Sequence, residues 1–235
     1  MNDEAVAFLR ARRRPLELVI FDCDGVLIDS ETLSNRVLAT VLTEAGWPMT
    51  AEESDRRFIG ISFYDVQPIA EAHLHRSLGI DWVDRIVSRV TEVMRRDANL
   101  VPGAREAVEA VIASGLRWRI ASNSSHTEMA AKFGRVGWQD LVAGRVHSAV
   151  DVISLGGAGK PAPDVYLAAL NAEAVPPAHC LVIEDSVAGV TAARAAGMDC
   201  LGLARHGDGA ALRAAGATTF RSMHDLPRLL RVALE

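Results

Sequence analysis

Short apolar runs alternate with helical patterns along most of this chain. Five runs rich in aliphatic and β-branched residues are predicted to be buried strands: Leu18–Phe21, Arg117–Ala121, Cys180–Ile183, Cys200–Ala204 and Thr218–Phe220. Helical patterns are found at Ala104–Ala113, Asp164–Ala174, Val187–Ala196 and Asp225–Leu234. Because strands that alternate with helices favour a parallel sheet covered on both faces, the sequence predicts an α/β fold.

The segment from residue 31 to residue 101 breaks this alternation. It contains no clear strand and has the pattern of successive amphipathic helices, one of which should begin at the capping-box sequence Thr50–Glu53. Trp47-Pro48, Gly60 and Gly79 mark breaks between these helices. We therefore predict two domains: an α/β core formed by residues 1–30 and 102–235, and an all-helical cap formed by residues 31–101.

Composition and charge exclude several classes of function. Of the 235 residues, 49% are hydrophobic and 23% are charged, which is ordinary for a globular protein, and the formal net charge is −5. This balance offers no broad basic surface for nucleic acid or an anionic membrane. The one basic run, Arg10–Arg14, is interpreted as a solvated arm. No apolar stretch is long enough to span a bilayer, so we expect neither nucleic acid nor membrane as a partner.

The cysteines and the N-terminal sequence bear on location. Cys23, Cys180 and Cys200 are odd in number and lack CxxC spacing, which favours reduced thiols over a disulfide framework. The first residues, MNDEAVAFLRARRR, begin with acids and contain too short an apolar run for a signal peptide. We therefore expect a cytoplasmic protein. The sequence does not define an oligomeric state and is compatible with a monomer.

Polar side chains follow three of the predicted strands, at the point where each strand ends. In an open parallel sheet, ligands bind beyond the carboxyl ends of the strands, so these side chains should lie near one another. A glycine-rich loop between the second and third of them delivers a lysine to the same edge. The candidate site residues are Asp22, Asp24, Ser122, Asn123, Lys160, Glu184 and Asp185.

This set of side chains suits phosphoryl transfer assisted by a metal ion. Clustered carboxylates repel one another, and Mg²⁺, which prefers oxygen ligands and substrate phosphate, would relieve that repulsion. We predict Asp22 as the nucleophile that forms an aspartyl-phosphate, and Asp24 as the acid and base for the leaving group and water. Ser122 and the Asn123 that follows it would bind the phosphoryl oxygens together with Lys160. The predicted metal ligands are Asp22, Asp24, Glu184 and Asp185.

Each motif also has a simpler interpretation. In Asp22-x-Asp24-Gly25 the glycine comes too early for a calcium loop and a predicted strand precedes it, and Gly159-Lys160 lacks the spacing of a P-loop. Lys160 alone would be read as a surface lysine. Ser122-Asn123 and Glu184-Asp185-Ser186 could each be a helix N-cap. The functional interpretation is favoured because the features occur together.

The motifs DxDGxxxDS, a strand ending in Ser-Asn, GKPAPD and a strand ending in Glu-Asp-Ser occur in this order, and together they resemble the haloacid dehalogenase superfamily in its β-phosphoglucomutase-like and sugar-phosphate phosphatase branch. The resemblance covers nearly the whole chain after residue 16. It implies a Rossmann-like core, a helical cap inserted after the first strand, and Mg²⁺-dependent phosphoryl transfer.

The resemblance also implies roles for individual residues. Asp22 would be both nucleophile and metal ligand, and Asp24 the acid/base with its backbone carbonyl on the metal. Ser122 and Lys160 would bind phosphate. Asp185, with Glu184, would hold or support the metal.

The cap decides between a phosphatase and a mutase. In the β-phosphoglucomutases a histidine follows the first motif and an arginine follows a Gly-Val-Ser sequence in the cap, where this chain has Ser34 and Phe63. We therefore expect a phosphatase of small phosphorylated metabolites, either sugar or sugar-acid phosphates. A β-phosphoglucomutase-type mutase is the first alternative. A non-catalytic phosphate-binding scaffold is the second, and the retention of every acid and of Lys160 argues against it.

Overall fold

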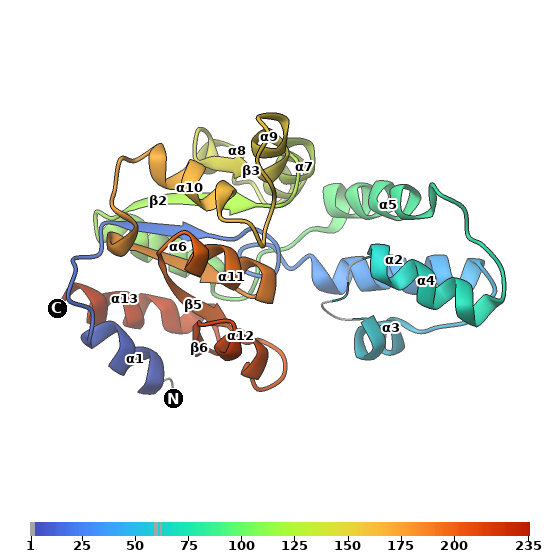
Figure 1. Ribbon diagram of the computed structural model, residues 1–235, viewed down its shortest axis with the longest axis horizontal. Coiled ribbons are helices and arrows are strands. Elements are labelled where there is room, and N and C mark those ends of the chain that lie inside the picture. Colours follow the sequence, from blue (N-terminus) through green and yellow to red (C-terminus); the bar gives the residue numbers. More distant parts are fainter. Residues whose placement is uncertain (1–2, 59–60, 62) are drawn as a thin grey trace.

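A six-stranded parallel sheet forms the centre of the larger domain (Figure 1). The structure is a computed structural model of the chain, and it describes residues 3–58, 61 and 63–235. The strand order is β3-β2-β1-β4-β5-β6, and Phe21 at the end of β1 pairs with Ile120 in β2 and with Ile183 in β4. The strands are β1 (Leu18–Phe21), β2 (Arg117–Ser122), β3 (Val146–Ser148), β4 (Cys180–Glu184), β5 (Asp199–Leu203) and β6 (Thr218–Phe220).

Helices bury both faces of this sheet. Alternate residues of β1 point to opposite sides, so Val19 and Phe21 belong to one apolar cluster and Leu18 and Ile20 to the other. The first cluster is completed by α1 (Asp3–Arg10), α6 (Ala104–Ala113), α7 (His126–Arg135), α8 (Gln139–Val142) and α13 (Leu226–Leu234). The second is completed by α9 (Ala149–Ser154), α10 (Asp164–Asn171), α11 (Val187–Ala195) and α12 (Ala210–Ala214). Single-turn 3₁₀ helices lie at Pro177–His179 and Met223–Asp225.

Four helices form a second body beside the sheet (Figure 1). They are α2 (Glu31–Glu44), α3 (Ala51–Phe58), α4 (Phe63–Leu74) and α5 (Trp82–Asp97), and they enclose their own apolar cluster around Leu42, Phe58 and Trp82. The predicted capping box is confirmed, because the N–H of Thr50 donates to Glu53 and the N–H of Glu53 donates to the Thr50 hydroxyl. The predicted break at Gly60 lies outside the described residues.

The two connections between the bodies run side by side. Ile28 and Leu100 form an antiparallel bridge, the N–H of Asp29 donates to the carbonyl of Asn99 at 2.9 Å, and the N–H of Val101 donates to that of Leu27 at 2.9 Å. Since the chain leaves and re-enters the core at this one place, we propose that the cap runs from residue 31 to residue 101.

The α/β class, the parallel sheet and the all-helical cap are confirmed, and the predicted element ends differ by a few residues. The sequence missed β3, which has three residues and no apolar run. The solvated-arm interpretation holds for Arg10, Arg13 and Arg14 and is wrong for Arg12. Its side chain is buried and paired with Asp199, because α1 packs its apolar face on α13 and brings the following residues against β5. Among the described residues, no helix is long and apolar enough to cross a membrane.

The buried Arg12 makes a testable contribution to stability. Its side chain is 4% exposed, it pairs with Asp199 and it donates to the carbonyl of Ala178 at 3.1 Å. We expect Arg12→Ala to lower the free energy of unfolding by about 1–3 kcal/mol in urea titrations, because Asp199 loses its partner. Arg13→Ala, at an exposed position of the same run, should change it by less than about 0.5 kcal/mol. Equal effects of the two substitutions would contradict the assignment.

Candidate active site

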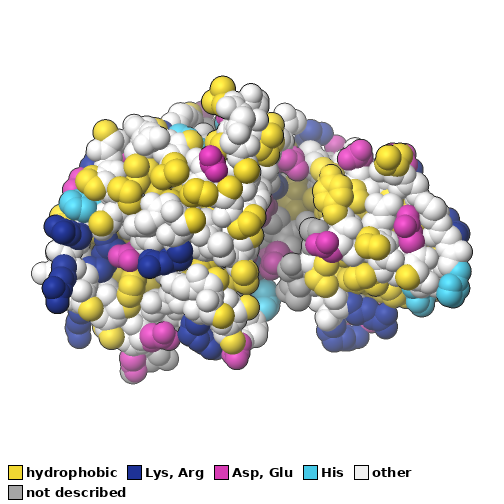
Figure 2. Space-filling model, in the orientation of Figure 1, with side chains coloured by type: hydrophobic (Ala, Val, Ile, Leu, Met, Phe, Trp, Pro, Cys, Tyr) yellow, Lys and Arg dark blue, Asp and Glu magenta, His cyan; other side chains and the backbone are white. Residues whose placement is uncertain are grey.

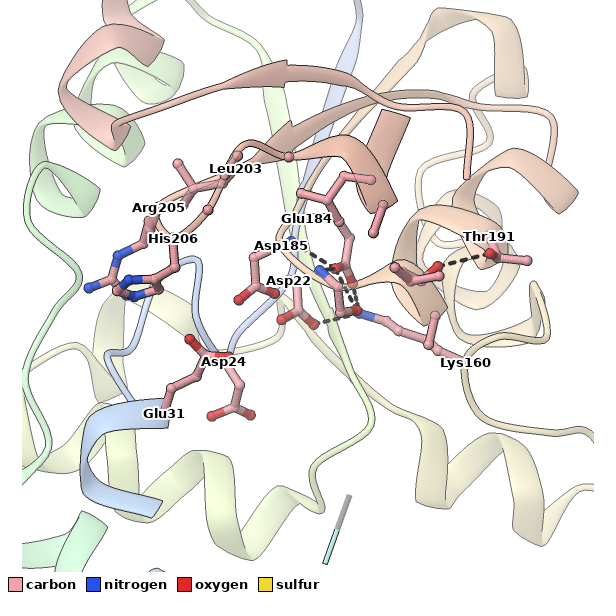
Figure 3. A pocket seen from close by; sticks show the side chains of 18 of the residues that line it. Asp22, Asp24, Glu31, Lys160, Glu184, Asp185, Thr191, Leu203, Arg205 and His206 are labelled. Atoms are coloured by element: carbon pink, nitrogen blue, oxygen red, sulfur yellow. Dashed lines mark hydrogen bonds and ion pairs between the residues drawn. The ribbon is translucent and has the colours of Figure 1, made fainter. Parts of the chain in front are cut away.

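The residues predicted to form the site all line one cavity, of about 970 Å³, at the carboxyl edge of the sheet (Figure 3). The order β2-β1-β4 places three strand ends side by side, so Asp22, Ser122 and Glu184 converge although they are distant in the sequence. Lys160 enters from the loop between α9 and α10. The structure therefore brings together Asp22, Asp24, Ser122, Asn123, Lys160, Glu184 and Asp185.

The ammonium group of Lys160 is the centre of the hydrogen-bond network. Its Nζ lies 2.5 Å from Oδ1 of Asp22, 2.7 Å from Oε1 of Glu184 and 2.9 Å from the carbonyl of Ala121. Burial alone would lower the pKa of Lys160, but the attraction of Asp22 and Glu184 outweighs it and raises the pKa, so the side chain stays charged. With 4% of the side chain exposed, Lys160 is not a surface lysine.

The carboxylate of Glu184 is fully engaged by protein donors. Its Oε1 accepts from Lys160 and from the hydroxyl of Tyr166 at 2.9 Å. Its Oε2 accepts from the N–H groups of Asp185 and Ser186 and from the Ser186 hydroxyl, at 2.8–2.9 Å. Although burial would raise the pKa of Glu184, Lys160 and these donors hold it below its usual value. This geometry favours a role for Glu184 in orienting Lys160 and supporting a cation site.

Asp22 and Asp185 form the acidic part of the site. Burial, followed by repulsion from neighbouring carboxylates, raises the pKa of Asp22 to about 7 even though Lys160 opposes the shift. Burial and repulsion from Glu184 and Asp22 raise the pKa of Asp185 well above its ordinary value. One carboxylate oxygen of each of Asp22, Glu184 and Asp185 lies within 4.8 Å of the others, so this group could hold a divalent cation.

Asp24 is held by groups that differ from those around Asp22. Nζ of Lys132 lies 2.7 and 2.8 Å from its two carboxylate oxygens, and the hydroxyl of Ser124 donates to Oδ2 at 2.8 Å. Burial would raise the pKa of Asp24, but Lys132, with smaller contributions from Ser30 and Ser124, lowers it. Sequence reasoning missed Lys132, which lies in the middle of an ordinary helical pattern in α7.

The residues after β2 lie on the side of the cavity where the sequence predicts phosphate binding. The hydroxyl of Ser122, which is 2% exposed, accepts the N–H of Ser124 at 3.0 Å. The side chain of Asn123 brackets the backbone of Lys160, accepting its N–H at 2.9 Å and donating to its carbonyl at 3.3 Å. The N-cap of α7 is Ser125, in a capping box with Glu128, so the N-cap interpretation of Ser122 and Asn123 is wrong. The N-cap interpretation of Glu184-Asp185-Ser186 is correct, because Ser186 caps α11.

Two glycines leave room for the acids. Gly25 has a φ of +76°, and a Cβ there would lie 1.7 Å from Oδ2 of Asp185. A Cβ on Gly189 would lie 1.6 Å from Oε1 of Glu184. Any other residue at Gly25 would displace the Asp185 carboxylate, and any other residue at Gly189 would displace that of Glu184.

A second, smaller cavity lies between the cap and the core, next to Asp24, and Figure 2 shows the surface hollowed between these two bodies. Its volume is about 290 Å³, and we call it the cap pocket. Asp24, Glu31 and Ser124 line both cavities, so the two meet there. Ser34 and Phe63, the two positions that the sequence compared with mutases, both line the cap pocket.

Comparison with known proteins defines the class. The family model described as haloacid dehalogenase-like hydrolase matches residues 16–197, and the chain belongs to this family. A solved haloacid dehalogenase-like protein of unknown function from Agrobacterium tumefaciens superposes with a TM-score of 0.81 at 32% identity, covering 94% of this chain and 100% of the other.

Among curated relatives, the phosphorylated carbohydrates phosphatase of Thermotoga maritima is 32% identical over 229 residues, which are 93% of this chain and 100% of that protein. The 6-phosphogluconate phosphatase of Escherichia coli is 26% identical over 91% of this chain and 94% of that protein. The chain spans only 19% of a longer relative, the chloroplastic SUPPRESSOR OF QUENCHING 1 of Arabidopsis thaliana, at 32% identity over 86% of this chain. With phosphatases among its relatives, the protein is a phosphoric monoester hydrolase, and the predicted family and branch are confirmed.

The room that Gly25 leaves for Asp185 can be tested. We expect Gly25→Ala to lower the free energy of unfolding by about 1–2 kcal/mol, because alanine is strained at this φ. Divalent-cation affinity, measured by calorimetry, should fall about 10–100-fold as Asp185 is displaced. Gly134→Ala is the control, since a Cβ there meets open space within α7, and it should leave both quantities unchanged or raise stability slightly. Unchanged cation binding in Gly25→Ala would contradict the proposed crowding.

Proposed function

We propose that the protein is a Mg²⁺-dependent phosphatase that hydrolyses small phosphorylated metabolites, sugar or sugar-acid phosphates, through an aspartyl-phosphate on Asp22. The observation that carries the proposal is the pairing of the two acids with separate cations. Asp22 lies against Lys160 in the phosphate site, and Asp24 lies against Lys132 where that site meets the cap pocket. Asp22 is thereby placed to attack a phosphoryl group, and Asp24 is placed where the leaving group would lie.

The carboxylates suit Mg²⁺. It is a hard cation that takes oxygen ligands, and a cation bound between Asp22 and Asp185 would oppose the burial and the mutual repulsion that raise their pKa values. Asp22 and Asp185 would hold it with the backbone carbonyl of Asp24, and Glu184 would support them. When bound, Mg²⁺ would neutralise the acids and withdraw charge from the phosphoryl oxygens.

Each side chain of the site has a separate role in the proposed reaction. Oδ of Asp22 attacks phosphorus, while Lys160 and the Ser122 hydroxyl stabilise the charge that develops on the phosphoryl oxygens. Because Lys132 keeps Asp24 charged in the free enzyme, Asp24 first takes up a proton as the substrate binds and then donates it to the leaving oxygen. It then takes a proton from the water that cleaves the aspartyl-phosphate, which restores Asp22 and releases inorganic phosphate.

The cap pocket supports a phosphatase over a mutase. A mutase has to bind the second phosphate of a bisphosphate, and this requires a cation in the pocket. Ser34 and Phe63 carry no positive charge, and the charge of Lys132 is already paired with Asp24. The names of the Thermotoga and Escherichia relatives point to sugar and sugar-acid phosphates, which is the substrate class we propose here.

The covalent step predicts the behaviour of Asp22→Asn. The amide cannot accept the phosphoryl group, so kcat for release of inorganic phosphate should fall about 10³-fold or more in a variant with an unchanged circular dichroism spectrum. The wild-type enzyme, quenched in acid during turnover with ³²P-labelled substrate, should carry label on Asp22. A folded Asp22→Asn variant with normal turnover would exclude the mechanism. Conversion of a sugar 1-phosphate to its 6-phosphate without phosphate release would support the mutase.

The raised pKa of Asp22 predicts that Mg²⁺ binding depends on pH. Below about pH 7 the cation has to displace a proton from this carboxyl group, so the apparent affinity should fall about 10-fold between pH 8 and pH 6. Binding should release protons, which calorimetry in two buffers of different ionisation enthalpy would detect. An affinity that is the same at both pH values, without proton release, would contradict the assignment of Asp22 as a ligand.

A further inference from the structure

The two cavities fix where the halves of a substrate lie. The phosphoryl group has to contact Asp22, Ser122 and Lys160, which line only the larger cavity. The rest of the substrate has to place its bridging oxygen beside Asp24, which lines both. Beyond Asp24 the cap pocket continues between the cap and α7, so it is the compartment that can hold the leaving group. At about 290 Å³ it is at the small end of ligand pockets.

The charged residues of the cap pocket are mostly acids. They are Asp24, Glu31, Glu128 and Lys132. Lys132 contacts both carboxylate oxygens of Asp24, so its positive charge is balanced by that carboxylate. Glu128 is fixed by the capping box of α7, where it accepts from the N–H and the hydroxyl of Ser125. The described lining of the pocket thus has no cation left for a substrate group.

The arginines of the cap do not add a positive charge to the cap pocket. Arg89 pairs with Glu44, Arg95 pairs with Glu92, and the guanidinium of Arg57 lies over the ring of Trp47. None of the cap arginines is among the residues that line the pocket. The sequence has Ile, Gly and Ser at positions 59, 60 and 62, which lie outside the described residues and carry no charge.

Two basic side chains lie at the rim of the larger cavity, in the loop after β5. Figure 3 shows Arg205 and His206 near Glu31, across the cavity from Lys160. Both terminal nitrogens of Arg205 lie 3.3 Å from carboxylate oxygens of Asp29, in the connection to the cap. Arg205 is therefore engaged in holding the connection and does not face the cap pocket.

The remaining lining of the cap pocket contains both polar and apolar side chains. Ser30, Ser34 and Asn35 provide hydroxyl and amide groups, which bind hydroxyls. The apolar residues of the lining are Phe58, Ile61, Phe63, Val87, Val90 and Met94. Such a surface suits a carbon chain that carries hydroxyl groups and has one apolar face.

We propose that the cap pocket selects an uncharged, hydroxyl-bearing leaving group and rejects a second anionic group, so that the substrate is the monophosphate of a neutral sugar or polyol. This inference rests on the proposed phosphatase activity and narrows it by excluding sugar-acid phosphates and bisphosphates. A carboxylate or second phosphate in the pocket would lie beside Glu31 and Glu128 without a cation, and like charges brought together in a partly dry site repel strongly.

Matched substrates test the selection directly. Each pair differs only in a terminal CH₂OH or COO⁻ group: glycerol 3-phosphate and 3-phosphoglycerate, erythritol 4-phosphate and 4-phosphoerythronate, glucitol 6-phosphate and 6-phosphogluconate. Release of inorganic phosphate is measured with Mg²⁺, and the pair with the fastest turnover is scored. We expect kcat/KM to be about 100-fold higher for the polyol phosphate of that pair.

Position 34 offers a matched pair of variants. Ser34 lies on α2, lines the pocket and takes no part in the proposed chemistry. Ser34→Lys adds a cation, and Ser34→Gln adds a side chain of similar length without charge. We expect Ser34→Lys to reduce the preference for the polyol phosphate at least about tenfold, through a lower KM for the acid, and Ser34→Gln to leave the ratio unchanged. Melting temperatures confirm that both variants fold.

The outcomes separate the two proposals. Equal turnover within the scored pair, or preference for the acid, would overturn the selection while leaving the phosphatase intact. Release of phosphate from phenyl phosphate, but from none of the paired compounds, would also overturn the selection while leaving the phosphatase activity intact. A ratio that changes equally in Ser34→Lys and Ser34→Gln would show that size, not charge, governs the pocket. Absence of phosphate release from every compound would overturn the phosphatase proposal itself.

Discussion

The site depends on one buried ammonium group, that of Lys160, held between Asp22 and Glu184. These side chains come from a loop and two neighbouring strands, and the repulsion between the two acids would separate them without the cation. Four donors from Tyr166, Asp185 and Ser186 hold the Glu184 carboxylate, and Glu184 in turn holds the ammonium group of Lys160. Glu184 at the end of β4 therefore fixes the position of the Lys160 ammonium group. The position of Glu184 relative to Asp22 is set by the pairing of β1 with β4.

The sequence predicted the parts that follow from periodicity and from strand ends. Apolar runs such as Leu18–Phe21 located the buried strands, and the loss of that rhythm after residue 30 located the helical cap. The convergence of Asp22, Ser122 and Glu184 followed from a general property of parallel sheets, that their carboxyl ends share an edge. The metal, its ligands and the individual catalytic roles are expectations that the geometry supports, and binding and kinetic measurements decide them.

What the sequence could not predict depends on contacts between distant elements. Lys132 has no motif and becomes part of the site only because α7 packs beside the turn that carries Asp24. β3 is too short and too polar to show a pattern, and it exists because β2 offers an unpaired edge. Arg12 belongs to a basic run that resembles a solvated arm until α1 docks on α13. The charge of the cap pocket likewise combines residues of α2, of α7 and of the turn after β1, which are distant in the sequence.

The paired connections between the domains have a mechanical consequence. The two connections are joined by backbone hydrogen bonds into a short ribbon, and this ribbon links the cap to the core. The foot of this ribbon is the turn that begins at Asp24, because the N–H of Gly25 donates to the carbonyl of Ile28 at 2.8 Å. A movement of the cap about this ribbon would therefore act on the turn that holds Asp24, the residue proposed to carry the proton.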